Sequence, residues 1–481
     1  MPPQRLIVFC DGTWVGRETS LPQAPLSTIR QLANQVGVVH FVPTLMQEPT
    51  IVHPIVPYNP NVIAGYQEGI GLNRTFLEYL WDGATAASIG EECVSLYKFI
   101  VQHYTDEHEI LLFGYSRGAF TVRCVGGMIN NCGILKVSAL QHLEDLDTLC
   151  REVYRTYRSP LPIDHPRSER CRKLKDDRGS VWQVKQPIRF MGLIDTVGAL
   201  GVPRLNAGIG LDYSEIEFYD QKVSSSVQVV YQALSLHERW WALQPCFVSS
   251  GDGERKAVIR QMWFPGVHHD LGRQTFRFLR QRPWNAVEQL LSTLPHLLSK
   301  TQWPNEVCAD LVARWLLQGV KDVESPVDAN LTFPGIDHEI RRLSLRIEAP
   351  DLGTLGSGDT SSIRNTTPNP DSNIFDPLKR ILSLPFTLLN FVFPRFSNET
   401  TDFLGVSAIL KIFTATNDRR IPRATEQENV YPYWEEESVV DDIGRERKFT
   451  VAQSAALQRT EGRYMSRTYE TFLTRKGVFG W

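Results

Sequence analysis

The sequence lacks three features that would each assign it to a class of protein. No run of about 18 apolar residues occurs along its 481 residues, so no membrane-spanning helix is expected. Its 51 lysine and arginine residues are balanced by 54 acidic ones, and this even charge gives no general attraction to nucleic acid. The eight cysteines form no C-x-x-C pair and no cluster with histidine at metal-ligand spacing, so no metal site is predicted.

A secretory signal is also missing from the start of the sequence. A short apolar run, residues 6–10, precedes Asp11 and is too short for the core of a signal peptide. We therefore expect a cytoplasmic protein with reduced thiols. No P-loop or dinucleotide-type glycine pattern follows a strand, so no organic cofactor is implied, and no pattern specifies an oligomeric state.

The most informative stretch joins an apolar strand to a helical segment through a short turn. Residues 109–113 indicate a buried strand, residues 119–123 have helical spacing, and Gly114-Tyr-Ser-Arg-Gly118 stands between them. This is the G-x-S-x-G pattern of a nucleophile elbow, in which glycines let strand and helix approach and the serine hydroxyl stands above the sheet edge. Ser116 is the candidate nucleophile, and a structural turn serine is the alternative.

A second apolar strand, residues 5–10, runs into the turn Asp11-Gly-Thr-Trp14. Ligands gather at the carboxyl ends of parallel strands, so this turn is expected at the functional rim. In a hydrolase of this kind, one oxyanion donor is the amide after the nucleophile, here Arg117, and the other comes from an early strand-to-helix loop. The amides of Gly12 and Thr13 are the candidates for the second donor, with a simple tight turn as the alternative.

Two later strands end in residues that complete a catalytic triad. Residues 188–194 lead to Asp195, which suits the acid that orients a histidine, although a helix N-cap is the alternative. Residues 258–264 lead to His268 and His269. The order serine, acid, histidine is that of the α/β hydrolases. The sequence pattern leaves open which of the two histidines is the base.

The order of the predicted elements favours an α/β fold with a doubly wound, mostly parallel sheet. Strands are predicted at 5–10 and 50–58, and a helix at 83–104 precedes the strand that leads to the serine. Residues 65–71 are expected to form a glycine-rich loop. Residues 227–241 are expected to form a helix.

Four ordered motifs together resemble one known family. They are Cys10-Asp-Gly-Thr-Trp14, Phe113-Gly-Tyr-Ser-Arg-Gly-Ala119, Asp195-Thr-Val-Gly-Ala-Leu-Gly201 and Trp263-Phe-Pro-Gly-Val-His-His-Asp270. Over roughly residues 4–290, the chain resembles the α/β-hydrolase-like catalytic domain of type VI secretion phospholipase effectors. The resemblance implies Ser116 as nucleophile, Asp195 as acid and His268 as base. The site rim then comprises Asp11, Trp14, Tyr115, His269 and Asp270.

One departure from the family pattern concerns the loop after the histidine. The family usually continues with aspartate, valine and several glycines, whereas this chain reads Asp270-Leu-Gly-Arg-Gln274, so the loop backbone is expected to differ. The predicted activity is that of a serine hydrolase that cleaves a carboxylic ester, of a lipid or phospholipid, through an acyl-Ser116 intermediate. The alternative is a catalytically silent hydrolase-fold protein used for binding.

The chain is predicted to divide into a catalytic domain, residues 1–345, a flexible linker or long loop, 349–377, and a C-terminal extension, 378–481, that is partly helical. Within the first domain, residues 136–186 are basic with interleaved acids, which favours a solvated helical insertion over a surface for phosphate headgroups. The apolar segment 378–393 has three interpretations: a lid, a peripheral membrane contact or a packed core segment.

Overall fold

The computed structural model describes most of the first 348 residues and three short strands near the C-terminus. The described residues are 4–12, 15, 24–42, 51–69, 86–139, 145–198, 222–236, 238, 243–250, 256–264, 266–277, 301–302, 304–348, 430–432, 437–440 and 446–449. Several sequence predictions therefore concern residues outside the described part: Thr13, Trp14, the linker 349–377, the apolar segment 378–393, most of the extension 378–481 and the end of the predicted helix 227–241.

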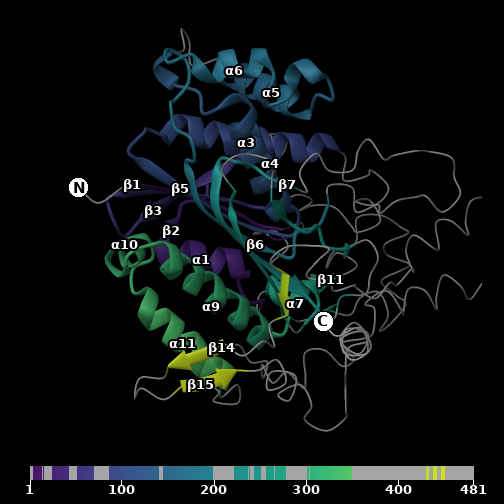
Figure 1. Ribbon diagram of the computed structural model, residues 1–481. Helices are drawn as coiled ribbons and strands as arrows, with labels where there is room; N and C mark the ends of the chain where they lie inside the picture. The colour runs from purple at the N-terminus through teal and green to yellow at the C-terminus, as the bar shows by residue number, and fades with distance from the viewer. Residues whose placement is uncertain are drawn as a thin grey trace, which may run out of the picture.

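A twisted, mostly parallel sheet forms the centre of the described structure (Figure 1). Its strand order is β13-β10-β8-β6-β5-β1-β4-β3-β2, and only the pairings of β3 with β4 and β2 are antiparallel. In chain order the strands are β1 (Gln4–Cys10), β2 (Gly37–Val39), β3 (Val52–Pro57), β4 (Val62–Gln67), β5 (His108–Tyr115), β6 (Ile188–Ile194), β8 (Val227–Ser235), β10 (Val258–Phe264) and β13 (Val430–Pro432).

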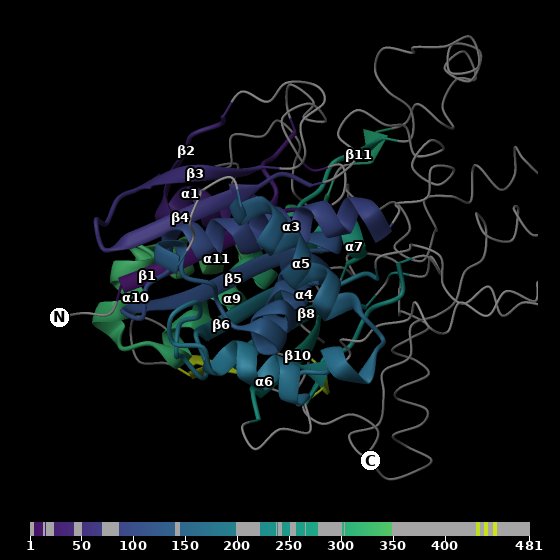
Figure 2. The ribbon, with the colours of Figure 1, turned by 90° about the horizontal axis from the view of Figure 1, so that it is seen from above.

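Helices cover both faces of the sheet, as Figures 1 and 2 show. One face carries α3 (Ala86–His103), α4 (Arg117–Cys132), α5 (Asp145–Arg158) and α6 (Glu169–Asp176). The other carries α1 (Thr28–Val36), α9 (Glu306–Val323), α10 (Pro326–Thr332) and α11 (Ile336–Glu348). The short helix α7 (His268–Leu271) lies at the end of the sheet opposite the N-terminus, where the parallel strands finish. The predicted doubly wound α/β fold is confirmed.

Small elements complete the description. Three pairs of short strands lie outside the main sheet, namely β7 (Lys222–Val223) with β9 (Ser249–Ser250), β11 (Phe276–Arg277) with β12 (Thr301–Gln302), and β14 (Glu437–Val440) with β15 (Glu446–Phe449). Two 3₁₀ turns, η1 (Val137–Ala139) and η2 (Pro162–Asp164), flank α5. No helix within the described ranges is both long and apolar enough to cross a membrane.

Two apolar cores explain why the sheet is sandwiched. Alternate residues of each central strand point to opposite faces, so Leu6 and Val8 join the core under α3 and α4 while Ile7 and Phe9 join the core under α1 and α9. Each central strand is consequently buried on both sides. That double burial is why these strands appear in the sequence as continuous apolar runs.

Two predicted elements are corrected by the structure. Residues 65–67, predicted as part of a loop, end strand β4, and Gly65 is needed there because a Cβ would lie 2.5 Å from Val52 Cγ1 and 2.8 Å from Phe99 Cζ. Residues 227–235, predicted as helix, form strand β8. The run lacks a period of two because both faces are buried, and its valines favour an extended backbone.

The predicted insertion 136–186 contains α5 and α6, and its basic residues lie among acidic partners. Arg151 pairs with Glu91 of α3 and with Asp147, and Lys173 pairs with Glu169 on the surface of α6. The insertion itself stays a prediction. Toward the C-terminus, α11 continues to Glu348, and β13 pairs with β10. The domain boundaries stay predictions.

Candidate active site

Ser116 stands at a sharp turn between β5 and α4. Its backbone has φ 56° and ψ −121°, a conformation that residues with a side chain rarely adopt. The flanking glycines make this turn feasible, because a Cβ on Gly114 would lie 2.6 Å from the Cα atom of Ala119, and one on Gly118 would lie 2.4 Å from the carbonyl oxygen of Asp11. The strand, turn and helix therefore have the geometry that a nucleophile elbow requires.

Three side chains from distant parts of the chain meet at this turn. Nε2 of His268 lies 2.9 Å from Oγ of Ser116, and Nδ1 of His268 lies 2.7 Å from Oδ2 of Asp195. All three are buried, with relative exposures of 5% for the serine, 3% for the histidine and 0% for the aspartate. When Nδ1 carries the proton and donates it to the carboxylate, Nε2 is free to accept the serine hydroxyl proton.

Asp195 is fixed by strand β8 as well as by the histidine. The amide of Ser235 donates to Oδ1 and the hydroxyl of Ser235 donates to Oδ2, both at 2.9 Å. The aspartate follows β6 with a left-handed φ of 41°, which turns its side chain toward His268. The Asp195 carboxylate thus contacts both His268 and β8, and its role as the orienting acid stays a prediction.

We call α7 and the residues that follow it up to Gln274 the histidine turn. Its two other predicted residues, His269 and Asp270, have different surroundings. The ring of His269 lies at right angles to that of His268, with 5.7 Å between ring centres, and burial lowers its pKa to about 3. The carboxylate of Asp270 accepts from the amides of Val267 and Asn305, and burial raises its pKa to about 6. His269 is therefore neutral near pH 7, and Asp270 connects the turn to the start of α9.

Tyr115 packs against the imidazole of His268. Its ring stacks on the His268 ring with 4.9 Å between centres, and its hydroxyl donates to the backbone oxygen of His268 at 3.2 Å and to Oε1 of Gln274 at 2.9 Å. Complete burial raises the pKa of Tyr115 well above its usual value, so the phenol stays protonated and remains a donor.

Asp11 lies beside the elbow within a buried polar group. Its carboxylate accepts hydrogen bonds from the Ser27 hydroxyl, from Tyr66 at 2.8 Å and from the Gly12 amide at 3.1 Å. Burial raises the pKa of Asp11 to about 7, while these three donors act in the opposite direction. A Cβ on Gly12 would lie 3.1 Å from Cβ of Ser116, so this glycine packs directly against the nucleophile.

The predicted oxyanion donors are only partly described. Arg117 is the first residue of α4, immediately after Ser116, so its backbone amide lies at the positive end of the helix. The Gly12 amide already donates to Asp11, so an oxyanion role would require that hydrogen bond to be shared or broken. Thr13 and Trp14 lie outside the described residues.

The structure adds residues that the sequence motifs did not identify. Ser235 supports Asp195, Glu238 accepts from the His268 amide at 3.3 Å, and Ser27 and Tyr66 bind Asp11. Ser235 is the last residue of β8, so interpreting that segment as a strand would have placed it at the site edge. Among the described residues, no group of three or more His, Cys, Asp or Glu side chains is arranged to hold a metal ion.

Comparison with known proteins finds a curated relative and similarities to solved structures. An uncharacterized protein of Saccharomyces cerevisiae is 28% identical over 207 residues, which are 41% of this chain and 27% of that protein, so this chain spans about a quarter of the relative's length. A solved structure of the Tle1 effector bound to the VgrG spike of the type 6 secretion system is 15% identical, covers 72% of this chain and 80% of its own, and has a TM-score of 0.29.

An uncharacterized protein from Pseudomonas aeruginosa is 11% identical, covers 86% of this chain and 64% of its own, and has a TM-score of 0.28. The family model for the catalytic domain of Tle1-like phospholipase effectors of the type VI secretion system matches residues 4–289. That match spans both β1 and the histidine turn and covers more than half of the 481 residues. The protein therefore belongs to the family of Tle1-like phospholipase effector catalytic domains.

Proposed function

We propose that the protein is a serine hydrolase that cleaves the acyl esters of lipids or phospholipids through an acyl-Ser116 intermediate. Membership of a phospholipase effector family supports a lipid-ester hydrolase in general terms. The observation that carries the serine mechanism is the contact of His268 with both Ser116 and Asp195, at 2.9 and 2.7 Å.

The first half of the proposed reaction forms the acyl-enzyme. Nε2 of His268 takes the Ser116 proton as Oγ attacks the ester carbonyl, and Asp195 stabilises the imidazolium that forms. The carbonyl oxygen becomes an oxyanion, which the Arg117 amide and a second amide from residues 12–13 would hold. Collapse of this intermediate breaks the bond to the alcohol, and His268 returns its proton to the leaving oxygen.

The second half releases the acid. A water molecule attacks the acyl carbonyl while Nε2 of His268 takes one of its protons. The same oxyanion donors hold the new intermediate. Collapse breaks the bond to Oγ, and His268 gives its proton to Ser116. The ester and water are thus converted to an alcohol and a carboxylic acid, and the enzyme is regenerated.

A fluorophosphonate probe tests the mechanism directly. We expect covalent capture of the wild-type protein, located at Ser116 by mass spectrometry of its peptides, and no capture of Ser116→Ala. Ester substrates are then compared as short-chain esters, triglycerides and phospholipid vesicles, because the triad determines the chemistry while the acyl and headgroup contacts determine preference. Failure of a folded wild-type protein to react would contradict the enzyme proposal and favour the binding function.

A peripheral membrane contact through residues 378–393 belongs to the same proposal. The segment is apolar with Lys379, Arg380 and Arg395 at its edges, a composition suited to an anionic membrane surface. Deletion of residues 378–393 should reduce association with anionic vesicles while the melting temperature of the remaining protein is preserved. Unchanged association in the deletion variant would remove this part of the proposal.

A further inference from the structure

The turn that carries His268 ends in an unusual residue. After α7 the amide of Arg273 donates to the Asp270 carbonyl at 3.1 Å and the amide of Gln274 donates to the His269 carbonyl at 2.9 Å. These two hydrogen bonds form a Schellman motif with Arg273 at the position after the C-cap. Arg273 has φ 52° there, a left-handed conformation for which glycine is the usual residue.

The side chain of Arg273 compensates for this backbone conformation. Its side chain is 1% exposed, and its guanidinium donates to Oε2 of Glu306 at 2.8 Å and to Oδ1 of Asp310. Glu306 and Asp310 are one turn apart on α9, so both carboxylates face the same cation. Since a planar guanidinium reaches two carboxylates at once, the end of the turn is held in one orientation.

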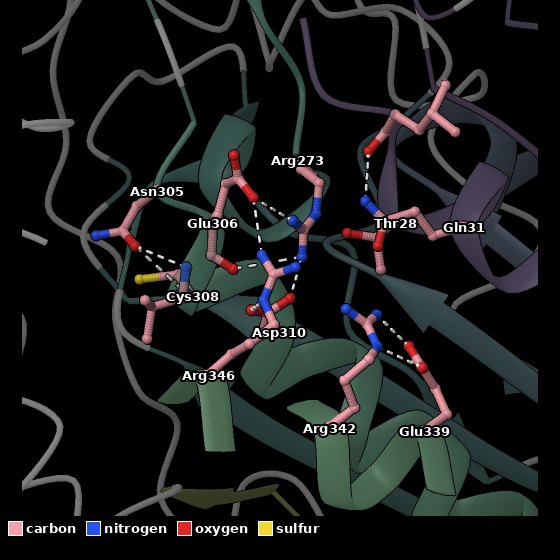
Figure 3. Close-up of polar contacts among 12 residues, drawn as sticks. Thr28, Gln31, Arg273, Asn305, Glu306, Cys308, Asp310, Glu339, Arg342 and Arg346 are labelled. Carbon is pink, nitrogen blue, oxygen red and sulfur yellow. Dashed lines mark hydrogen bonds and ion pairs between the residues drawn. The ribbon is translucent and has the colours of Figure 1, made fainter. Parts of the chain in front are cut away.

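A second arginine binds the same two carboxylates from another helix. Arg346 of α11 donates to Oδ2 of Asp310 at 2.7 Å and to Oε2 of Glu306 at 2.8 Å (Figure 3). Figure 3 shows the two guanidinium groups converging on Glu306 and Asp310 from opposite sides. The four residues form a largely buried ion cluster with two positive and two negative charges, in which only Arg273 is attached to the histidine turn.

Other contacts fix the turn along its length. Thr28 of α1 donates through its amide to the Gly272 carbonyl at 3.0 Å and through its hydroxyl to the Leu271 carbonyl at 2.9 Å. The amide of Asn305, the N-cap of α9, donates to Asp270 at 2.8 Å. Arg273 and Asp270 thus join the turn to the first turns of the same helix, and Thr28 joins it to α1 on another side.

We propose that Arg273 is a positioning residue that holds the His268 imidazole in register with Ser116 and Asp195. Its role rests on the proposed serine hydrolase function and adds to it a device outside the triad. The guanidinium does not touch the reacting atoms. It acts by fixing the end of α7, because a displacement of the turn by a fraction of an ångström would lengthen the 2.9 Å contact between Nε2 and Oγ.

A matched pair of variants separates positioning from stability. Arg273→Gln and Arg346→Gln each remove one guanidinium and leave one on Glu306 and Asp310, so both are expected to lower the melting temperature of the full-length protein. Only Arg273→Gln should also lower kcat and the rate of fluorophosphonate labelling at Ser116, by about 10- to 100-fold, with KM changed by less than about threefold. Arg346→Gln should keep kcat within about threefold of the wild type.

Arg273→Gly provides a second variant in case the glutamine variant does not fold. Glycine adopts the left-handed backbone readily but supplies no side chain to the cluster, so the variant should fold and still lose labelling rate. Equal kcat losses in the Arg273 and Arg346 variants, or wild-type kcat in both Arg273 variants, would overturn the proposal.

A spectroscopic measurement makes the result independent of turnover. The proton between Nδ1 of His268 and Asp195 should give a far-downfield signal in the proton NMR spectrum, assigned by its loss in His268→Ala. We expect this signal to broaden or disappear in the Arg273 variants and to persist in Arg346→Gln. Persistence in all variants would overturn the positioning role, whereas absence of Ser116 labelling in the wild type would overturn the hydrolase function alone.

Discussion

Two of the three turns that bring the candidate triad together are held in different ways. At the elbow around Ser116, neighbouring backbone atoms leave no room for a side chain, since a Cβ on Gly118 would lie 2.4 Å from the carbonyl oxygens of Cys10 and Asp11. The histidine turn is held in place by hydrogen bonds with side chains of β5, α1 and α9. Both turns contain a residue with positive φ, Ser116 in one and Arg273 in the other.

The difference explains why glycine spacing alone identifies the elbow, whereas the end of the histidine turn departs from the family pattern. A backbone that passes within contact distance of another backbone admits only glycine, so the elbow requires fixed residues at fixed spacing. A turn held by side chains can use any partners of suitable length and charge. In the histidine turn, an arginine with two carboxylates 33 and 37 residues away takes the place where a glycine would be expected.

The largest expected effect tests which imidazole the histidine turn presents. His268→Ala should lower kcat by about 10⁴-fold or more, because no other group then accepts the serine proton. His269→Ala should be milder, about 10-fold, since the ring of His269 packs against that of His268 while Nε2 of His268 faces Ser116. Both are measured by ester turnover on folded protein. Equal losses or the reverse ranking would show that the wrong histidine has been chosen.

The packing of backbone atoms at the elbow is tested by a substitution at Gly118. Gly118→Ala should lower the free energy of unfolding by about 3 kcal/mol or more, because its Cβ would meet two carbonyl oxygens that belong to β1 and its turn. Gly179→Ala is the control, since a Cβ there meets only Asp177 Oδ1 at 3.2 Å, and it should cost less than about 1 kcal/mol. Urea unfolding provides the measurement, and similar losses in both variants would contradict the steric argument.

A fall in pH should lower the free energy of unfolding of the protein through protonation of His269. Burial lowers the pKa of His269 to about 3 in the folded protein, below its unfolded value near 6.5, so the unfolded chain binds more protons between these values. Stability from this group is therefore present above pH 6.5 and lost as pH falls. From pH 6.5 to 5 the loss is about 2 kcal/mol.

His269→Gln removes the titrating group and isolates this contribution. The difference in unfolding free energy between pH 7.5 and pH 5 should be about 2 kcal/mol smaller in the variant than in the wild type. Urea unfolding at both pH values gives the comparison, with nearby His268 and Asp195 present in both proteins. Parallel curves for the two proteins would show that His269 does not resist protonation in the folded state.

The smallest effect is expected where the two turns touch. Tyr115 precedes Ser116 in the chain, and its hydroxyl donates to the His268 carbonyl and to Gln274. Tyr115→Phe keeps the ring stacked on the imidazole but removes both hydrogen bonds. We expect a loss of about 1 kcal/mol in stability and a several-fold decrease in kcat, measured by thermal unfolding and ester turnover. A full wild-type kcat would show that ring packing alone aligns the two turns.

Much of the fold followed from the sequence because strand burial is visible in it. The strands that end at Cys10, Tyr115 and Ile194 are largely apolar runs, the strand that ends at Phe264 mixes apolar residues with Arg260 and Gln261, and each is present in the sheet. The same rule produced the error at β8, where apolar residues on both faces resemble the spacing of a buried helix. A short run buried on both sides does not distinguish strand from helix by period alone.

The sequence by itself determined the features that appear as residue types and apolar runs: the elbow with its two glycines, the strand ends at Asp11 and Asp195, and the order of serine, acid and histidine. Tertiary structure alone decided the distance at which His268 meets Ser116, how Ser235 supports Asp195, and how Arg273 reaches Glu306 and Asp310. The reason is physical. A close approach of two backbones restricts the residue type itself, even when the second backbone is distant in the chain, so it is visible in the sequence. Hydrogen bonds between buried side chains depend on distances that exist only once the layers have packed.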